Sequence, residues 1–278
     1  MRRRAEVPDA AVRHVMGISG GKDSAALALH MRDRVPEMEY FFCDTGAELP
    51  ETYEYLQRLE VGLGKPIARL NAEQGFEHWL RVYQGALPSP QMRWCTKVLK
   101  IKPLEAWIGE AETVSYVAIR ADENRDGYIS HKPNISAVYP FKEDGIDKAG
   151  VMRILDDAGI GLPSYYEWRT RSGCYFCFFQ RKAEWVGLAE RHPDLFEQAV
   201  AFEEKAGYEA QAMQGRSYTW SHKESLRELA GRRVEIMTKH EAALARERRK
   251  QTNVPLIDVM AGVLDEDDDT LACQMCQL

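Results

Sequence analysis

Short apolar runs alternate with segments of helical periodicity along the first half of the chain. The runs that predict buried strands are residues 14–18, 38–43, 67–70 and 114–119. The intervening segments that predict helices are residues 24–31, 51–63 and 76–82. Because strands alternate with helices, we expect an α/β fold whose mostly parallel, doubly wound sheet carries helices on both faces.

The pattern changes from about Tyr165 onward, where cysteine, aromatic and charged residues follow one another without clear strands. Helical periodicity returns at residues 194–205 and 234–249. We therefore predict an α/β domain over residues 1–164. A mainly helical, cysteine-containing C-terminal appendage follows over residues 165–278, with the acidic run 266–269 in a solvated tail.

The composition supports a folded core, since 45% of the 278 residues are hydrophobic and 10% are aromatic. The longest apolar runs, such as residues 15–18 and 24–29, fall far short of the ~20 residues that span a bilayer. The charged start, Met1-Arg2-Arg3-Arg4, is not followed by the apolar stretch of a secretion signal. We expect no membrane contact and a cytoplasmic location.

A glycine-rich hexapeptide stands between the first predicted strand and its helix, in the sequence Ser19-Gly20-Gly21-Lys22-Asp23-Ser24. At such a place consecutive backbone N–H groups and a helix N-terminus can surround an anion. The pattern is not that of the Walker A loop, because Asp23 stands where Walker A has Ser or Thr and the glycine spacing is one residue too short. A phosphate-binding loop is predicted, and a kinase or GTPase is disfavoured.

This hexapeptide matches the PP-loop of the ATP pyrophosphatases, and the segments after it resemble the PAPS reductase-like branch of that superfamily. The resembling segments are residues 42–48, 93–96, 100–104 and 119–125. Within the branch the chain looks most like the ATP pyrophosphatases of DNA phosphorothioation systems of the Dnd/Ssp type. The resemblance implies an adenine nucleotide α-hydrolase-like fold that binds ATP and Mg²⁺.

The resemblance also gives expected roles to individual residues. Asp44 and Thr45, after the second strand, are expected to flank the adenosine, at the sheet edge where open α/β sheets bind ligands. Arg120 is expected to pair with phosphate. The expected catalytic residues are Lys22, Asp23, Cys95 and Arg120. The carboxylates implied in Mg²⁺ binding are Asp122, Glu123 and Asp23, which could instead cap its helix.

Cysteines occur as two Cys-x-x-Cys pairs, Cys174/Cys177 and Cys273/Cys276. This spacing suits metal binding, and by itself it does not choose between zinc and an iron–sulfur cluster. The resemblance adds Cys95 as a ligand of a 4Fe-4S cluster, although Cys95 could instead be a nucleophilic thiol activated by Arg93 and Lys97. Cys43, inside a strand, is expected to be a core residue.

The resulting hypothesis is that the protein adenylates an acceptor oxygen, which sulfur then replaces. The implied partners are a cysteine desulfurase as sulfur donor, DNA as substrate and other phosphorothioation proteins; the oligomeric state stays open, a homodimer included. A net charge of −6 argues against broad nucleic-acid binding but not against a local basic groove. Candidates to guide DNA are Arg93, Lys97, Lys100 and Lys102.

Three other functions stay open. A PAPS or APS reductase would use the same pocket, but such enzymes carry a degenerate loop and a tail cysteine beside Gly and His, whereas this chain has Lys22 and Asp23 and a different tail. A tRNA thiolase would share the ATP step and act on a base. A non-catalytic, metal-stapled nucleic-acid adaptor would release no pyrophosphate.

Overall fold

The computed structural model describes residues 12–124, 132–214, 218–221 and 224–250. Within these ranges the chain forms two compact units. The first contains the chain up to Phe76 together with Trp94–Cys174. The second contains Glu77–Arg93 together with the chain from Tyr175 onward. None of the helices among the described residues is long and apolar enough to cross a lipid bilayer.

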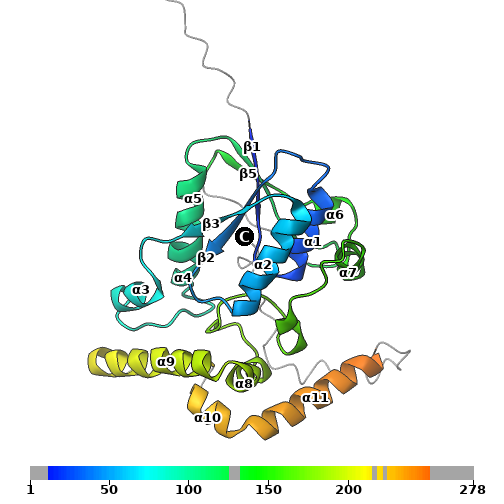
Figure 1. Ribbon diagram of the computed structural model, residues 1–278. Coiled ribbons are helices and arrows are strands. Elements are labelled where there is room, and N and C mark those ends of the chain that lie inside the picture. Colours follow the sequence, from blue (N-terminus) through cyan, green and yellow to red (C-terminus); the bar gives the residue numbers. More distant parts are fainter. Residues whose placement is uncertain (1–11, 125–131, 215–217, 222–223, 251–278) are drawn as a thin grey trace, which may run out of the picture. The chain divides into compact units, whose positions relative to one another are not determined.

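A parallel sheet forms the centre of the first unit (Figure 1). Its strands are β1 (Arg13–Gly17), β2 (Glu39–Asp44), β3 (Ile67–Asn71), β4 (Thr113–Tyr116) and β5 (Ile135–Val138). Their order across the sheet is β3-β2-β1-β4-β5, and every neighbouring pair is parallel. The chain therefore builds outward from β1 to one edge through β2 and β3, and then crosses to the other side of β1 for β4 and β5.

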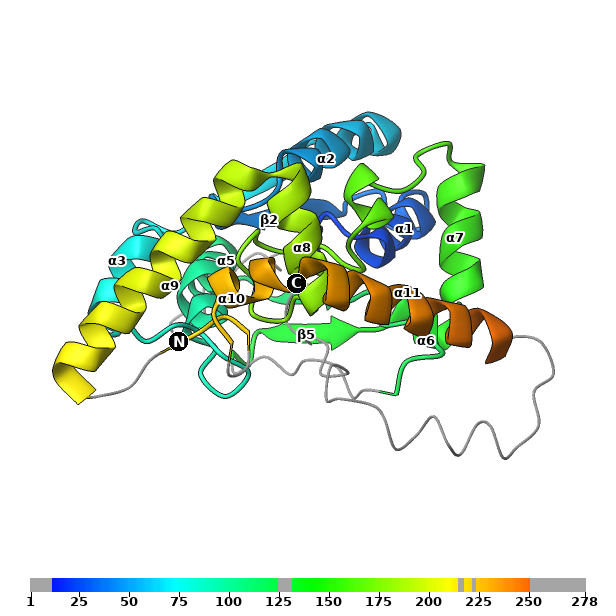
Figure 2. The ribbon, with the colours of Figure 1, turned by 90° about the horizontal axis from the view of Figure 1, so that it is seen from below.

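Helices connect these strands. Those of the first unit are α1 (Lys22–Met31), α2 (Pro50–Leu63), α4 (Trp94–Thr96), the π-helical turn η1 (Lys97–Ile101), α5 (Lys102–Ile108), α6 (Pro140–Glu143), α7 (Lys148–Asp157) and the 3₁₀ turn η2 (Ser164–Glu167). Helix α7 lies beside α1 (Figures 1 and 2). Helix α3 (Phe76–Val82) begins at the last residue of the first unit's first segment and continues into the second unit.

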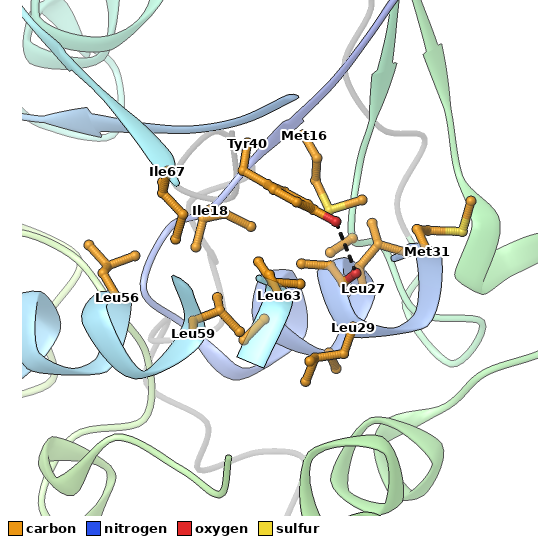
Figure 3. Close-up of a cluster of buried hydrophobic side chains, with 14 of the residues drawn as sticks. Met16, Ile18, Leu27, Leu29, Met31, Tyr40, Leu56, Leu59, Leu63 and Ile67 are labelled. Atoms are coloured by element: carbon orange, nitrogen blue, oxygen red, sulfur yellow. Dashed lines mark hydrogen bonds between the residues drawn. The ribbon is translucent and has the colours of Figure 1, made fainter. Parts of the chain in front are cut away.

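The strands bury both faces because neighbouring side chains point to opposite sides of the sheet. Met16 and Tyr40 pack with residues of α1, α2 and α7, and the Tyr40 hydroxyl donates a hydrogen bond to the Ala28 carbonyl oxygen in this cluster (Figure 3). Val15 and Phe41, one position away on the same strands, pack on the other face with residues of α5. The doubly wound α/β fold expected from the sequence is confirmed.

The second unit is helical apart from an isolated bridge, as far as the described residues show. Its further helices are α8 (Lys182–Arg191), α9 (Pro193–Gln214), α10 (Leu226–Gly231) and α11 (Arg233–Lys250), which Figure 2 shows in yellow-green to orange. Trp220 stacks on Phe176 with ring centroids 5.4 Å apart. The buried Glu203 carboxylate accepts hydrogen bonds from the Trp220 and Leu226 amides, which ties the segment before α10 to α9. The expected helical character is confirmed for these residues.

The structure departs from the sequence prediction at the fourth strand. The sequence predicts this strand over residues 114–119, but β4 ends at Tyr116, and the Ile119 amide bonds back to the Val117 carbonyl oxygen in a tight turn. The sequence does not predict strand β5, because Ile135-Ser136-Ala137-Val138 is short and only weakly apolar. Arg120 therefore lies on a loop four positions beyond β4 and not at the end of the strand itself.

The limit between the two units also differs from the predicted limit between residues 164 and 165. Residues up to Cys174 belong to the first unit, while Glu77–Arg93 belong to the second. A physical reason is visible at Tyr165, whose buried hydroxyl donates a hydrogen bond to the Gly20 carbonyl oxygen at 2.7 Å. Within Glu77–Arg93, Leu80 and Leu87 are buried.

Candidate functional site

The phosphate-binding loop lies where the strand order reverses. Strand β1 has β2 on one side and β4 on the other, so the loops that leave β1 and β4 diverge at their carboxyl ends. Ligands of open α/β sheets bind in the crevice that this divergence creates. Ser19–Ser24 follow β1 and Arg120 follows β4, which brings the predicted loop and the predicted arginine to the same edge of the sheet.

Serine hydroxyls hold the loop in its curved shape. The Ser24 hydroxyl accepts a hydrogen bond from the Ser19 amide and donates one to the Gly21 carbonyl oxygen, both at 3.1 Å. The Gly21 amide donates to the Ser19 hydroxyl at 3.3 Å. Helix α1 starts at Lys22 without a side-chain cap on its preceding residue. The first amides of an α-helix have no partner inside the helix, so this end can bind an anion.

Both glycines are required by space, and Gly20 is required by its backbone conformation as well. Gly20 has a φ of +77°, and a Cβ there would lie 2.6 Å from Thr52 Cγ2. A Cβ on Gly21 would lie 2.9 Å from Ser172 Oγ and 3.4 Å from the Tyr166 hydroxyl. Any side chain at either position would therefore collide with the wall that the loop is packed against.

Charged side chains gather beside the loop. Asp23 is buried, and its two oxygens contact Lys22 Nζ at 2.6 Å and an Arg120 nitrogen at 3.2 Å. Arg120 also pairs with Asp122 at 2.9 Å and with Glu123 at 3.0 Å. The structure thus brings together three of the predicted site residues, Lys22, Asp23 and Arg120, with the two acidic residues that the sequence singled out for Mg²⁺.

Arg120 is charged at every pH of interest. Burial alone would lower its pKa, but the hydrogen bond to Asp122 and the charges of Asp23 and Glu123 raise that pKa above its ordinary value. Reciprocally, the hydrogen bond from Arg120 lowers the pKa of Asp122. Asp122 is therefore ionised beside a fixed guanidinium, and such a cluster of carboxylates and cations suits a polyphosphate carrying a divalent cation.

Residues 165–174 form a further wall of the loop that the sequence analysis did not identify. Tyr165 donates to the Gly20 carbonyl oxygen, the Tyr166 hydroxyl accepts from the Lys22 amide at 3.1 Å, and the Ser172 hydroxyl donates to Ser19 Oγ at 3.3 Å. Arg169 is 2% exposed and donates to the carbonyl oxygens of Gly173 and Cys174. The available sequence signal is the cluster Tyr165-Tyr166, which the sequence prediction assigns to the appendage.

Asp44 is the last residue of β2 and Thr45 follows it, so both lie at the predicted carboxyl end of the strand, and both already have protein partners. Asp44 Oδ1 accepts hydrogen bonds from the Tyr53 hydroxyl at 2.8 Å and the Gly46 amide at 2.9 Å. The Thr45 hydroxyl donates to Glu48 at 3.0 Å and lies 3.2 Å from Cys174 Sγ. Their expected contact with adenosine stays a prediction, while their present contacts shape the turn after β2.

The described cysteines differ in their surroundings. Cys43 is buried in the core, as predicted, and burial raises its pKa to about 11. Cys174 is half-buried, with its thiol 3.6 Å from a Glu48 oxygen. Cys95 and Cys177 are also half-buried. Among the described residues, no three His, Cys, Asp or Glu side chains form a group that could hold a metal ion. Cys273 and Cys276 lie outside the described residues, so the proposed ligand set stays a prediction.

Cys95 is the middle residue of the short helix α4, and η1 follows α4 directly, so the segment is helical as expected. Activation of its thiol by Lys97 does not follow, because side chains two positions apart in a helix do not face each other. Lys97 and Lys102 are exposed on the surface of η1 and α5. The guanidinium of Arg93 lies over the Phe179 ring at 5.5 Å, within the second unit.

A segment of the chain that includes the phosphate loop matches a known protein-family model. Residues 13–134 match the model of the phosphoadenosine phosphosulfate reductase domain. That segment contains the phosphate loop, the turn after β2, Cys95 and Arg120. This match supports the expected relation to the PAPS reductase-like family for this segment. The narrower Dnd/Ssp type stays a prediction.

Among the curated relatives are two uncharacterized proteins of Methanocaldococcus jannaschii, each 26% identical, over 202 and 197 residues. These alignments cover 69% and 66% of this chain but 47% and 40% of the relatives, so the chain spans less than half of their length. An uncharacterized 37.8 kDa protein of Escherichia phage 186 is 24% identical over 302 residues, covering 84% of this chain and 86% of that protein.

Among solved structures, the phosphate complex of phosphoadenylyl-sulfate (PAPS) reductase from Candida auris is similar to this chain with a TM-score of 0.47 and 12% sequence identity. The similarity covers 59% of this chain and 82% of the reductase.

Proposed function

We propose that this protein with a PAPS reductase-like domain is an ATP pyrophosphatase that adenylates an acceptor oxygen and prepares it for replacement by sulfur. The observation that supports this proposal best is the phosphate loop Ser19–Ser24 at the reversal of strand order, with Lys22 and Arg120 as fixed cations beside it. A loop of backbone amides next to two cations suits the pyrophosphate part of a nucleoside triphosphate.

In the proposed reaction an acceptor oxygen attacks the α-phosphorus of ATP. A bond forms between that oxygen and the α-phosphorus, while the bond from the α-phosphorus to the bridging oxygen breaks and leaves its electron pair on pyrophosphate. The amides at the start of α1, Lys22 and Arg120 stabilise the negative charge that develops on this leaving group. A persulfide sulfur then forms a bond to the acceptor atom, and the bond from that atom to the adenylated oxygen breaks, so that AMP leaves with the electron pair. A second thiol cleaves the remaining sulfur–sulfur bond and becomes part of a disulfide.

The acidic residues near the loop fit a magnesium ion. Mg²⁺ in nucleotide sites is commonly held by one or two carboxylates together with substrate phosphates, so a large group of acidic residues is not required. Asp23 is the best placed of these carboxylates to bind the ion, since it lies in the loop. Its negative charge is balanced by ion pairs with Lys22 and Arg120. When bound, the ion would neutralise charge on the pyrophosphate.

The acceptor in this proposal is a DNA backbone phosphate, with a cysteine desulfurase as the source of sulfur. Lys97 and Lys102 support a polyanion partner because both are exposed on adjoining helical segments of the first unit. For the sulfur step we propose a 4Fe-4S cluster held by Cys95, Cys174, Cys177 and one cysteine of the pair Cys273/Cys276. The three described cysteines are not grouped as metal ligands in this structure, so cluster binding would have to bring them together. Thiolates suit iron–sulfur clusters, and zinc is the alternative.

Phosphoadenylyl-sulfate reduction is the second candidate, because the matched family model is named for that reaction. In that case the same loop and Arg120 would hold the phosphates of PAPS or APS, and a cysteine would attack its sulfur. Lys22 and Asp23 favour the ATP reaction, since together they complete the PP-loop pattern.

The test uses the full chain, purified anaerobically, in two assays. The first measures AMP and pyrophosphate from Mg-ATP with DNA, tRNA or neither, in the presence of a desulfurase and cysteine. The second measures sulfite from labelled PAPS or APS with thioredoxin. We expect pyrophosphate release that depends on DNA and falls at least a hundredfold in Lys22→Ala, roughly the loss of one charged contact to the leaving group.

A matched control is Lys239→Ala, which removes an exposed lysine of α11 in the second unit and should leave the rate unchanged. Sulfite formation without pyrophosphate release would identify a sulfonucleotide reductase. Dependence on tRNA in place of DNA would indicate a thiolase. No turnover in either assay, together with normal cellular function of Lys22→Ala, would indicate a non-catalytic adaptor.

A further inference from the structure

Tyr165 and Tyr166 both contact the phosphate loop, but the hydroxyl of Tyr165 donates a hydrogen bond to the loop and that of Tyr166 accepts one from it. The two rings stack with centroids 5.1 Å apart. Tyr165 is 1% exposed, and its hydroxyl donates its proton to the Gly20 carbonyl oxygen. The hydroxyl of half-buried Tyr166 instead accepts a hydrogen bond, from the Lys22 amide at 3.1 Å. Tyr165 thus supports the loop, whereas Tyr166 contacts the end of it that binds anions.

The Tyr166 hydroxyl keeps its own proton available. A tyrosine hydroxyl carries one donor hydrogen and its oxygen can also accept, and here the oxygen accepts from the Lys22 amide. No acceptor for its proton lies within hydrogen-bond distance among the described residues. Burial raises the pKa of Tyr166, although the Lys22 amide opposes this, so the proton stays on the oxygen at neutral pH. The Tyr166 hydroxyl is thus oriented by the Lys22 amide, and its hydrogen can be donated to a ligand oxygen.

The position of this donor indicates which ligand oxygen it meets. Lys22 is the first residue of α1, so its amide belongs to the set that receives a phosphate group at a helix N-terminus. The hydroxyl also lies 3.4 Å from where a Cβ on Gly21 would be, which places it against the loop backbone. A phosphate oxygen bound by the neighbouring amides of this loop therefore lies next to the hydroxyl proton.

We propose that Tyr166 is a phosphate-binding residue whose hydroxyl, oriented by the Lys22 amide, donates a hydrogen bond to the pyrophosphate portion of the bound nucleotide. The proposal rests on the proposed function, since it concerns the same phosphate loop. It extends the site beyond the matched segment 13–134 to residue 166. Tyr166 belongs to the same compact unit as the loop.

The test is calorimetric titration of the full chain with inorganic pyrophosphate, with Mg-ATP and with adenosine. Tyr166→Phe removes one oxygen and keeps the ring. We expect its Kd for pyrophosphate and for ATP to rise about tenfold, the size of one hydrogen bond to a charged group. The Kd for adenosine should not change, because adenosine carries no phosphate. Tyr40→Phe is the matched control, since it removes a buried hydroxyl of the core that bonds the Ala28 carbonyl oxygen.

Each outcome decides whether the hydroxyl binds phosphate or only supports the fold. If Tyr166→Phe lowers the melting temperature but binds pyrophosphate like the wild type, the hydroxyl is structural and the inference is wrong. A tighter Kd in Tyr166→Phe would also overturn it, because the hydroxyl would then compete with phosphate. If Lys22→Ala loses pyrophosphate binding while Tyr166→Phe does not, the proposed function stands and this inference alone falls. A wild-type chain that binds no pyrophosphate would contradict both.

Discussion

Gly20 shows how a single residue sets the shape of the phosphate loop. Two separate features exclude other residues here. The φ of Gly20 is +77°, which strains any residue with a side chain, and an added Cβ would lie only 2.6 Å from Thr52 Cγ2. We expect Gly20→Ala to lower the free energy of unfolding by roughly 2–4 kcal/mol, combining left-handed strain with overpacking. Nucleotide binding should fall with it. Chemical denaturation and pyrophosphate titration measure the two effects.

Gly64 provides the control for this experiment. It ends α2 with a φ of +64°, but no atom lies within 4 Å of its Cβ position. Gly64→Ala should therefore cost only the strain, about 1 kcal/mol, and leave binding intact. In the Gly20→Ala background, Thr52→Ser removes the colliding methyl group and should restore part of the stability. Equal costs at both glycines would show that the Thr52 contact is unimportant.

Cys43 illustrates how burial controls the chemistry of a thiol. With its pKa raised to about 11, about one Cys43 side chain in a thousand is a thiolate at pH 8, and the thiolate is the reactive form. We expect native protein treated with iodoacetamide to be labelled at half-buried Cys174 well before 3%-exposed Cys43. Mass spectrometry of the peptides measures both rates. Labelling of Cys43 as fast as in urea-unfolded protein would contradict its place in the core.

At the scale of secondary-structure elements, the contact between Tyr165 and the phosphate loop makes a separate prediction. Tyr165→Phe leaves the buried Gly20 carbonyl oxygen without its donor, which costs about 1–3 kcal/mol. We expect faster hydrogen exchange at the amides around Gly21 as the loop loosens. Tyr55→Phe is the control, since its hydroxyl donates to the Gly161 carbonyl oxygen and not to the loop. Similar exchange in the two variants would show that Tyr165 does not hold the loop.

The elements that the sequence predicts well share strong local signals. Strands β1 and β2 are buried on both faces, and a run of apolar residues marks such strands. The phosphate loop carries its own signal in glycines and Lys22. Strand β5 and the wall at Tyr166 are not predictable in the same way, because β5 is short and Tyr166 reaches the loop across 144 positions of sequence. Local patterns do not encode such distant contacts.

At the scale of the whole molecule, the chain forms two compact units, so we expect a ligand of the first unit to stabilise that unit and not the second. A ligand that binds only the folded first unit stabilises it by about 2.7 kcal/mol at a concentration a hundred times its Kd. We expect pyrophosphate to slow hydrogen exchange in residues 12–76 and 94–174 and to leave α8 and α10 in the second unit unchanged. Hydrogen exchange with mass spectrometry, with and without pyrophosphate, measures this peptide by peptide.

The decisive peptide in that experiment covers residues 165–174. If the first unit ends at Cys174, the backbone of this segment gains protection together with the phosphate loop, since Tyr165, Tyr166 and Ser172 all contact that loop. If the predicted limit after residue 164 is right, the segment will exchange like α8, with no response to ligand. Lys22→Ala, which weakens pyrophosphate binding, should abolish the difference in the first case. Protection that spreads equally through both units would mean that they unfold as one cooperative body.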